Sequence, residues 1–238
     1  MIFDPSKPPL TDSDGLLKSI PVEAGPEIWE RATRVVSSGL CDLQVNGFAG
    51  VDYNDPTLMP EEFEKSLFTM LSTGVTTCLP TVITGSEDWQ IQCFHALEKG
   101  RNASKLAQAM IPGYHLEGPF LNPEEGFCGC HPTKWIRPAT WDYFERLQEA
   151  AGGRITLITV APEIKGVLDL IPKLVEKGIA VAIGHCNPDR DTLLRAADAG
   201  VTLSTHLGNG IAQILPKKDN PILGQLAEDR FSASFIAD

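Results

Sequence analysis

Three residues that can bind a metal ion stand at the ends of apolar, strand-like runs. In the stretch Tyr114–Pro123, Glu117 closes a run in which polar and apolar residues alternate, the period-2 pattern of a strand, and a Gly-Pro pair stops the run at once. His185 and His206 each follow an apolar run as well. Because the carboxyl ends of parallel strands meet at one face of a barrel, we expect Glu117, His185 and His206 to form a metal site there.

This ligand set indicates a particular chemistry. A strand-end carboxylate alone is often a cap or a rim salt bridge, and a lone histidine is often a satisfied core residue, but the three together favour metal binding. Two histidines and one carboxylate leave an open position for water, and a divalent ion there lowers the pKa of the water and polarises a carbonyl, as amide hydrolysis requires. We expect one divalent ion, with zinc first and iron, manganese or cobalt as alternatives.

Two further groups of polar residues are candidates for positioning water or substrate. Gln44 and Asn46 face the same way on the first apolar run, where they either orient a ligand or simply end a strand before a turn. His131 lies in the Gly-rich loop Gly126–Pro132, which either folds over a ligand or carries a solvated histidine. We count all three among the predicted substrate-binding residues.

Three other short segments have a functional and a plain interpretation. The pair Asn209-Gly210 offers a side-chain amide and a backbone N–H to an anion, or forms an ordinary turn. Lys217 provides a positive charge for a phosphate, or belongs to a solvated pair with Lys218. Cys128 and Cys130 form a lone C-x-C, which is a weak zinc signal without a second pair.

The elements that must position these residues alternate between strand and helix. The predicted helix caps between the apolar runs are Ser86, Thr140, Asp169 and Asn187. The regular alternation of strand and helix indicates a parallel sheet. An open doubly wound sheet is the alternative to a barrel, but no G-x-G-x-x-G follows the first run. The apolar runs are Leu40–Val45, Thr76–Ile83, Met110–Glu117, Ile155–Pro162, Ile179–His185, Val201–His206 and Ser232–Asp238.

The polar run ends favour an α/β fold of the (β/α)₈ TIM-barrel type. With seven runs counted, we expect the barrel to be incomplete in this chain, without its last strand and last helices. Residues 38–238 are then the barrel domain, and residues 1–37, which are Pro-rich and weakly patterned, are an N-terminal extension.

Composition narrows the function further. The chain has 238 residues, of which 42% are hydrophobic, as suits one globular α/β domain. A net charge of −11 argues against nucleic acid and anionic membranes as partners, because both require a basic surface. Residues 1–10 lack a signal-peptide apolar region, and no run reaches the roughly 18 apolar residues of a membrane span. We expect a cytoplasmic protein with six reduced cysteines.

At several points the sequence resembles the N-acetylglucosamine-6-phosphate deacetylases of the amidohydrolase superfamily. The segments that carry the resemblance are Asp42–Gly47, His115–Phe120, Ala161–Glu163, Gly184-His185 and Thr205–Asn209, in family order. The resemblance implies a metal-dependent barrel, a small β-sandwich of which residues 1–37 would be a remnant, and a homodimer. It also implies that Glu117, His185 and His206 bind the metal.

The same resemblance implies that His131 and the Asn209-Gly210 pair contact the sugar phosphate. Gln44-Val-Asn46 is similar to the one-metal branch of the family. The expected function is hydrolysis of the N-acetyl amide of N-acetylglucosamine 6-phosphate, which gives acetate and glucosamine 6-phosphate.

Three departures from the family pattern keep two alternatives open. Gly208 and Gly210 replace the bulkier residues usual after the last histidine, and Lys217 stands where an arginine binds phosphate. The general-base aspartate of the family would lie beyond Asp238. The alternatives are an amidohydrolase acting on another N-acyl or cyclic amide substrate, and an inactive truncated homologue that binds metal or ligand.

Overall fold

The computed structural model describes residues 39–236 of the chain. The chain divides into two units, Met1–Leu40 and Cys41–Asp238, and the fold below is that of the second. The predicted N-terminal extension, residues 1–37, and its interpretation as a β-sandwich remnant lie outside the described residues.

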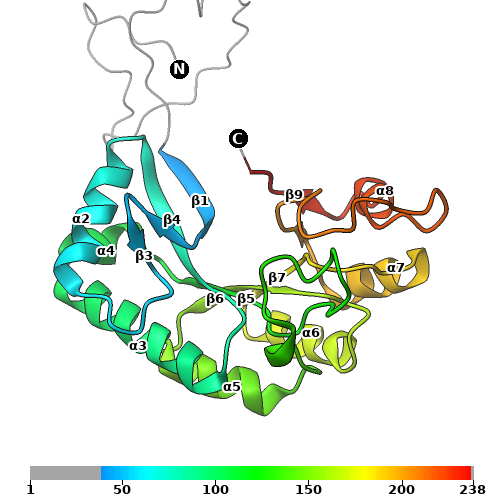
Figure 1. Ribbon diagram of the computed structural model, residues 1–238, viewed down its shortest axis with the longest axis horizontal. Helices are drawn as coiled ribbons and strands as arrows, with labels where there is room; N and C mark the ends of the chain where they lie inside the picture. The colour runs from blue at the N-terminus through cyan, green and yellow to red at the C-terminus, as the bar shows by residue number, and fades with distance from the viewer. Residues whose placement is uncertain (1–38, 237–238) are drawn as a thin grey trace, which may run out of the picture. The chain divides into compact units, whose positions relative to one another are not determined.

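The core of the fold is a seven-stranded sheet in which neighbouring strands also follow one another in sequence, apart from a small hairpin. Every strand pairing from β4 through β9 is parallel. In Figure 1 the sheet is curved rather than flat. This arrangement confirms the predicted barrel-type α/β fold as a partial barrel. The strands are, in sheet order, β1 (Leu40–Val45), β4 (Val75–Val82), β5 (Tyr114–Glu117), β6 (Ile155–Val160), β7 (Ala180–Ile183), β8 (Leu203–Ser204) and β9 (Ser232–Ala233).

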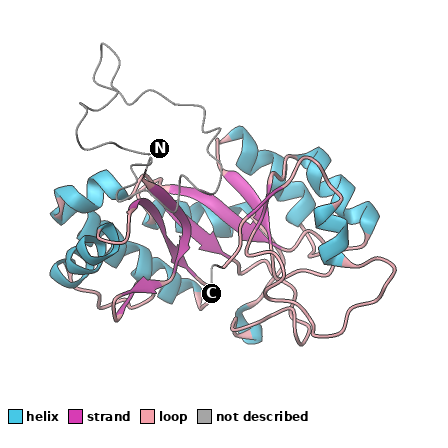
Figure 2. Cartoon of the chain, turned by 90° about the horizontal axis from the view of Figure 1, so that it is seen from above, coloured by secondary structure: helices cyan, strands magenta, loops and turns pink. Residues whose placement is uncertain are grey.

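Helices connect the strands and lie along the outside of the sheet (Figures 1 and 2). Between β1 and the first helix lies an antiparallel hairpin, β2 (Gly47–Phe48) with β3 (Val51–Asp52). None of the helices in residues 39–236 combines the length and apolarity that crossing a membrane requires. The helices are α2 (Pro60–Leu71), α3 (Glu87–Ala103), α4 (Lys105–Met110), α5 (Trp141–Ala150), α6 (Val167–Glu176), α7 (Arg190–Ala199), α8 (Pro221–Leu226) and a 3₁₀ turn, η1 (Thr133–Trp135).

Two of the four predicted helix caps are confirmed. Ser86 and Thr140 each accept a hydrogen bond from the backbone N–H three residues later, at the start of α3 and α5. Asp169 is not a cap, because α6 already begins at Val167. Gly166 permits the early start: its φ is +85°, and an added Cβ would lie 2.4 Å from the Ala139 carbonyl oxygen.

The predicted cap at Asn187 is also wrong, since α7 begins at Arg190 behind the cap Asp189. The Asp189 side chain accepts from the Thr192 N–H at 2.8 Å. Met110 likewise ends a helix rather than starting a strand, so that the predicted run Met110–Glu117 shortens to β5.

The concave side of the sheet is built in layers, because successive residues of a strand point to opposite faces. An apolar layer of Leu43, Leu79, Leu157, Ala182 and Leu203 comes from five strands. Two residues further along lie Thr81 in β4, Thr159 in β6 and Thr205 directly after β8, each buried. The larger apolar cluster packs the sheet against its helices. The next level, at the carboxyl ends of the strands, holds the polar residues that the sequence singled out.

Candidate metal centre

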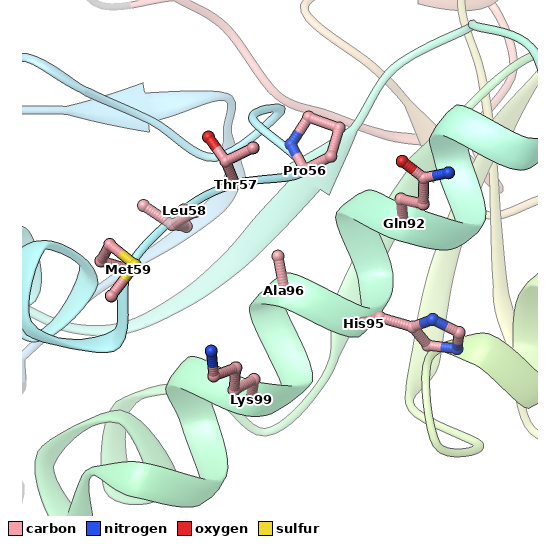
Figure 3. A pocket seen from close by; sticks show the side chains of 8 residues that line it. All are labelled: Pro56, Thr57, Leu58, Met59, Gln92, His95, Ala96 and Lys99. Atoms are coloured by element: carbon pink, nitrogen blue, oxygen red, sulfur yellow. The ribbon is translucent and has the colours of Figure 1, made fainter.

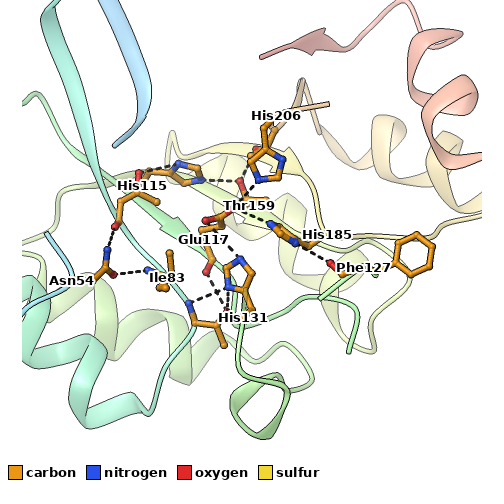
Figure 4. Close-up of polar contacts among 12 residues, drawn as sticks. Asn54, Ile83, His115, Glu117, Phe127, His131, Thr159, His185 and His206 are labelled. Carbon is orange, nitrogen blue, oxygen red and sulfur yellow. Dashed lines mark hydrogen bonds and ion pairs between the residues drawn. The ribbon is translucent and has the colours of Figure 1, made fainter. Parts of the chain in front are cut away.

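Glu117, His185 and His206 lie together at the carboxyl ends of β5, β7 and β8 (Figure 4). One ligand atom from each lies within 4.8 Å of the others, and all three side chains are buried. Glu117 Oε1 is 3.0 Å from His206 Nε2 and 3.2 Å from His185 Nε2. The three residues predicted as ligands from separate strand ends are therefore brought to one point.

Both histidines adopt left-handed backbone conformations. The φ angle is +50° at His185 and +32° at His206, directly after their strands. Histidine tolerates this region better than β-branched or bulky residues do. The turns therefore end the strands at the positions where the imidazoles join Glu117.

The hydrogen bonds of His185 fix which nitrogen is free. Its Nδ1 donates to the Phe127 carbonyl oxygen at 2.9 Å, so in the neutral ring Nε2 carries a lone pair. That lone pair faces Glu117 Oε1, which is also an acceptor. Two acceptors at this separation repel unless a cation lies between them, and this arrangement fits a divalent ion.

Glu117 is held as a carboxylate. Its side chain is only 2% exposed, and burial raises its pKa, but the nearby imidazole of His131 outweighs burial and holds the pKa well below the usual range. An anionic oxygen donor beside two imidazoles is a zinc-type ligand set with room for water.

His131 belongs to the same cluster, although it comes from the loop after β5. It is 2% exposed, which excludes the alternative of a solvated loop residue. Its Nε2 lies 3.7 Å from Glu117 Oε2. Its Nδ1 accepts a hydrogen bond from the Thr84 N–H at 3.4 Å and also lies 2.9 Å from the Thr84 hydroxyl oxygen. This bonding leaves the proton on Nε2, which has no hydrogen-bond partner among residues 39–236.

A second layer of polar residues supports the cluster and was missed by the sequence reasoning. His115 donates from Nδ1 to the Leu43 carbonyl oxygen at 3.0 Å, and its Nε2 lies 2.7 Å from Thr159 Oγ1. Thr159 Oγ1 is also 2.7 Å from Thr205 Oγ1. Desolvation lowers the pKa of His115 to about 4, so the ring is neutral. The available signal was its period-2 spacing from Glu117, which puts both on one face of β5.

The Asn209-Gly210 pair follows the last histidine in a tight turn. The Asn209 N–H donates to the His206 carbonyl oxygen at 2.9 Å, while its side chain is exposed. Gly210 packs on the other histidine, since an added Cβ would lie 2.4 Å from His185 Cε1. Gly129 approaches the same imidazole from the Gly-rich loop, with a corresponding distance of 2.8 Å.

Other predicted residues lie apart from the three-residue cluster. Gln44 is half-buried and Asn46 is exposed, and neither side chain hydrogen-bonds to Glu117, His185 or His206 within the described part of the chain. Lys217 is exposed and lines a hollow of about 270 Å³ with Arg190. Cys128 and Cys130 are free and do not join a group of metal-ligating side chains among residues 39–236.

Two more hollows contain no such ligand set. One, of about 270 Å³, lies between the loop before α2 and helix α3 and has His95 and Lys99 in its wall (Figure 3). The other, of about 360 Å³, is walled by Trp89, Trp135 and Thr84 among others. Neither the sequence pattern around His95 nor the residues beside it in this hollow indicate a role for its side chain.

A parallel α/β barrel segment that gathers polar side chains at the carboxyl ends of its strands has the architecture of TIM-barrel enzymes, whose active sites lie at that end. No family model matches the sequence. The N-acetylglucosamine-6-phosphate deacetylase of Bacillus subtilis is 32% identical over 233 residues, covering 95% of this chain and 58% of the relative. By its sequence and fold, the chain belongs to the N-acetylglucosamine-6-phosphate deacetylase family.

Two further relatives agree with this assignment. The N-acetylgalactosamine-6-phosphate deacetylase of a Shewanella strain is 32% identical over 209 residues, covering 84% of this chain and 49% of the relative. The N-acetyl-D-glucosamine-6-phosphate deacetylase of Mycobacterium smegmatis, solved as a D267A mutant with N-acetyl-D-glucosamine-6-phosphate, superposes with a TM-score of 0.73. That match is 27% identical and covers 83% of this chain and 50% of the other. The chain thus spans about half the length of the relatives it matches.

Proposed function

We propose that Glu117, His185 and His206 hold one divalent ion, which we expect to be zinc. The observation that supports this most directly is the buried carboxylate of Glu117 with His185 Nε2, the ring nitrogen that does not bond Phe127, turned towards it. When bound, the ion would polarise a carbonyl and lower the pKa of a bound water. The identity of the metal and the role of each ligand are parts of the proposal.

We further propose that the protein hydrolyses the N-acetyl amide of N-acetylglucosamine 6-phosphate, giving acetate and glucosamine 6-phosphate. The relatives named for this reaction support the proposal. In this chain, the free Nε2–H of His131 would donate to the amide carbonyl oxygen of the substrate, because the other ring nitrogen, Nδ1, is hydrogen-bonded to Thr84. Asn209, Gly210 and Lys217 would bind the phosphate, and Gln44 and Asn46 would shape the rim of the site.

A second candidate is the corresponding galactosamine sugar phosphate. It is favoured by the Shewanella relative, which is as similar to this chain as the Bacillus relative is. The two sugars differ only in the configuration of one hydroxyl group, so they are to be tested together. A cytoplasmic location and a homodimer remain predictions.

The test is acetate release by the zinc-loaded 238-residue chain from each sugar phosphate and from unphosphorylated N-acetylglucosamine. We expect release from a phosphorylated sugar, abolished by Glu117→Ala with loss of bound zinc. Glu98→Gln is the matched control, because Glu98 bonds Tyr114 and Arg154 on the helix side of the sheet. Lys217→Ala should raise KM about tenfold for phosphorylated sugars only, as expected for loss of one ion pair to substrate.

The outcomes separate the two parts of the proposal. Zinc content that is the same in Glu117→Ala and in the unmodified chain would refute the metal site. One bound zinc without acetate release from any of the three sugars would refute the deacetylase reaction for this chain and leave the metal site standing.

A further inference from the structure

The half-buried Glu163 and the buried Asn122 form a polar pair beside the proposed metal centre. Glu163 lies in the loop after β6, and its Oε1 accepts from Asn122 Nδ2 at 2.9 Å. The same oxygen accepts from the backbone N–H of Asn187 in the loop after β7. Asn122, in the loop after β5, is 5% exposed. One carboxylate oxygen therefore ties together three loops at the carboxyl ends of neighbouring strands.

These bonds form a closed ring around the backbone of His185. The Asn122 N–H donates to the His185 carbonyl oxygen at 3.0 Å, and Asn187 follows His185 by two residues. Glu163 thus holds one side of the His185 turn through Asn122 and the other side through Asn187. The turn needs such support, because His185 has a φ of +50°, a conformation that non-glycine residues adopt at a cost.

The same pair also reaches the imidazole. Asn122 Oδ1 accepts from the Glu124 N–H at 2.8 Å, and the Glu124 carbonyl oxygen accepts from the Phe127 N–H at 3.1 Å. The carbonyl oxygen of Phe127 is the acceptor for His185 Nδ1–H. The loop that starts at Asn122 therefore carries the group that turns His185 Nε2 towards Glu117.

We propose that Glu163 is a positioning residue for His185, acting through Asn122 and Asn187 on both its backbone and its imidazole. Glu163 does not itself approach the substrate or the metal in this scheme. Its contribution is geometric, and a neutral acceptor of the same shape should serve as well. The part of the proposal that concerns zinc rests on the proposed metal site, but the part that concerns the His185 backbone does not.

The first measurement is amide hydrogen exchange in the zinc-free 238-residue chain, for which no metal is needed. The informative amide is that of Asn122, because it bonds His185 and not Glu163. In Glu163→Ala its exchange should be faster by about tenfold, the equivalent of one lost hydrogen bond. Glu163→Gln should retain the slow exchange, because the amide oxygen can accept both bonds.

The second measurement is zinc affinity by competition with a chelator. Glu163→Ala should weaken zinc binding by about 10–100-fold, the usual effect of removing a group that orients a ligand, and Glu163→Gln should restore it. Asn122→Ala should weaken binding similarly, and the double variant should be no worse than either single one. Ser66→Ala is the control, since Ser66 is a buried residue that bonds Tyr53 and Phe63 far along the chain from these loops.

Three results would overturn the proposal. The first is an Asn122 amide that stays protected in Glu163→Ala. The second is unchanged zinc affinity in Glu163→Ala alongside a lowered Tm like that of Ser66→Ala, which would make Glu163 a stability residue only. The third is a Glu163→Gln variant that binds zinc as weakly as Glu163→Ala does, which would mean that the negative charge of Glu163, and not its geometry, supports zinc binding. If the unmodified chain binds no zinc, the proposed function fails, while the exchange result still decides the role of Glu163.

Discussion

Replacing Thr159 by valine would test whether the second polar layer stabilises the fold. Thr159 is fully buried, with a relative exposure of 0%, and its Oγ1 lies 2.7 Å from both His115 Nε2 and Thr205 Oγ1. Because the Leu43 carbonyl can only accept, His115 Nδ1 must donate, and Nε2 must accept from the Thr159 hydroxyl. Valine has nearly the same shape, so the change removes the hydroxyl without opening a cavity.

The magnitude follows from the two buried groups left without a partner. His115 Nε2 would lose its donor, and the Thr205 hydroxyl would lose its acceptor. A buried polar group left unpaired costs about 1–3 kcal/mol, and the Thr205 hydroxyl can rotate to recover part of its share. We therefore expect Thr159→Val to lower the free energy of unfolding by about 2–4 kcal/mol, a large part of the ~5–15 kcal/mol of an ordinary domain.

The assay is urea unfolding of the zinc-free chain, with the denaturant slope checked for constancy. Thr156→Val is the matched control, because Thr156 lies on the same strand but is exposed, and its change should stay within about 0.5 kcal/mol. If the two variants lose the same free energy to within that margin, the reasoning about the second layer is wrong.

Two more predictions concern the same cluster. His115 has a folded-state pKa of about 4, below its ordinary 6.5, so its contribution to stability is complete above pH 6.5 and is lost as the pH falls towards 4. Urea unfolding at pH 7 and pH 5 should show the loss, and an NMR titration in which this imidazole protonates near pH 6.5 would contradict it. Gly210→Ala and Gly153→Ala both place alanine at positive φ, which should cost about 1 kcal/mol of stability in each, with a further loss in Gly210→Ala from the close contact with His185. Only Gly210→Ala should weaken zinc binding, because its methyl group would collide with His185 while Gly153 faces open space. The loss of affinity should be about tenfold or more, as when a group that orients a metal ligand is removed. Equal zinc affinities in the two variants would refute this reasoning.

Much of the fold and the centre of the site could be predicted from the sequence for one physical reason. Strands buried on both faces read as continuous apolar runs, so a Glu or His that ends such a run stands out. This is why the sequence pattern singles out Glu117, His185 and His206, which the structure brings within 4.8 Å of one another. The start of α6 was missed because it depends on Gly166 packing against the Ala139 backbone, a contact between segments far apart in sequence.

The supporting residues were missed for a different reason. Glu163 and Asn122 lie in loops, where neither periodicity nor a cap pattern marks a position, and their partners come from other loops. Thr159 and Thr205 look like ordinary strand residues, since threonine is common in strands. Their role becomes visible only when the strands are side by side and His115 lies between them and Leu43.

The left-handed turns at His185 and His206 restrict how this site can change over evolutionary time. Among non-glycine residues, asparagine, aspartate and histidine are the ones that enter this backbone region most readily. Of these, aspartate also supplies a strong metal ligand, whereas cysteine and glutamate lack the backbone preference. If the two histidines hold the metal as proposed, a lineage that replaced either one would drift towards oxygen ligands and towards harder ions such as manganese or magnesium, and away from thiolate sites.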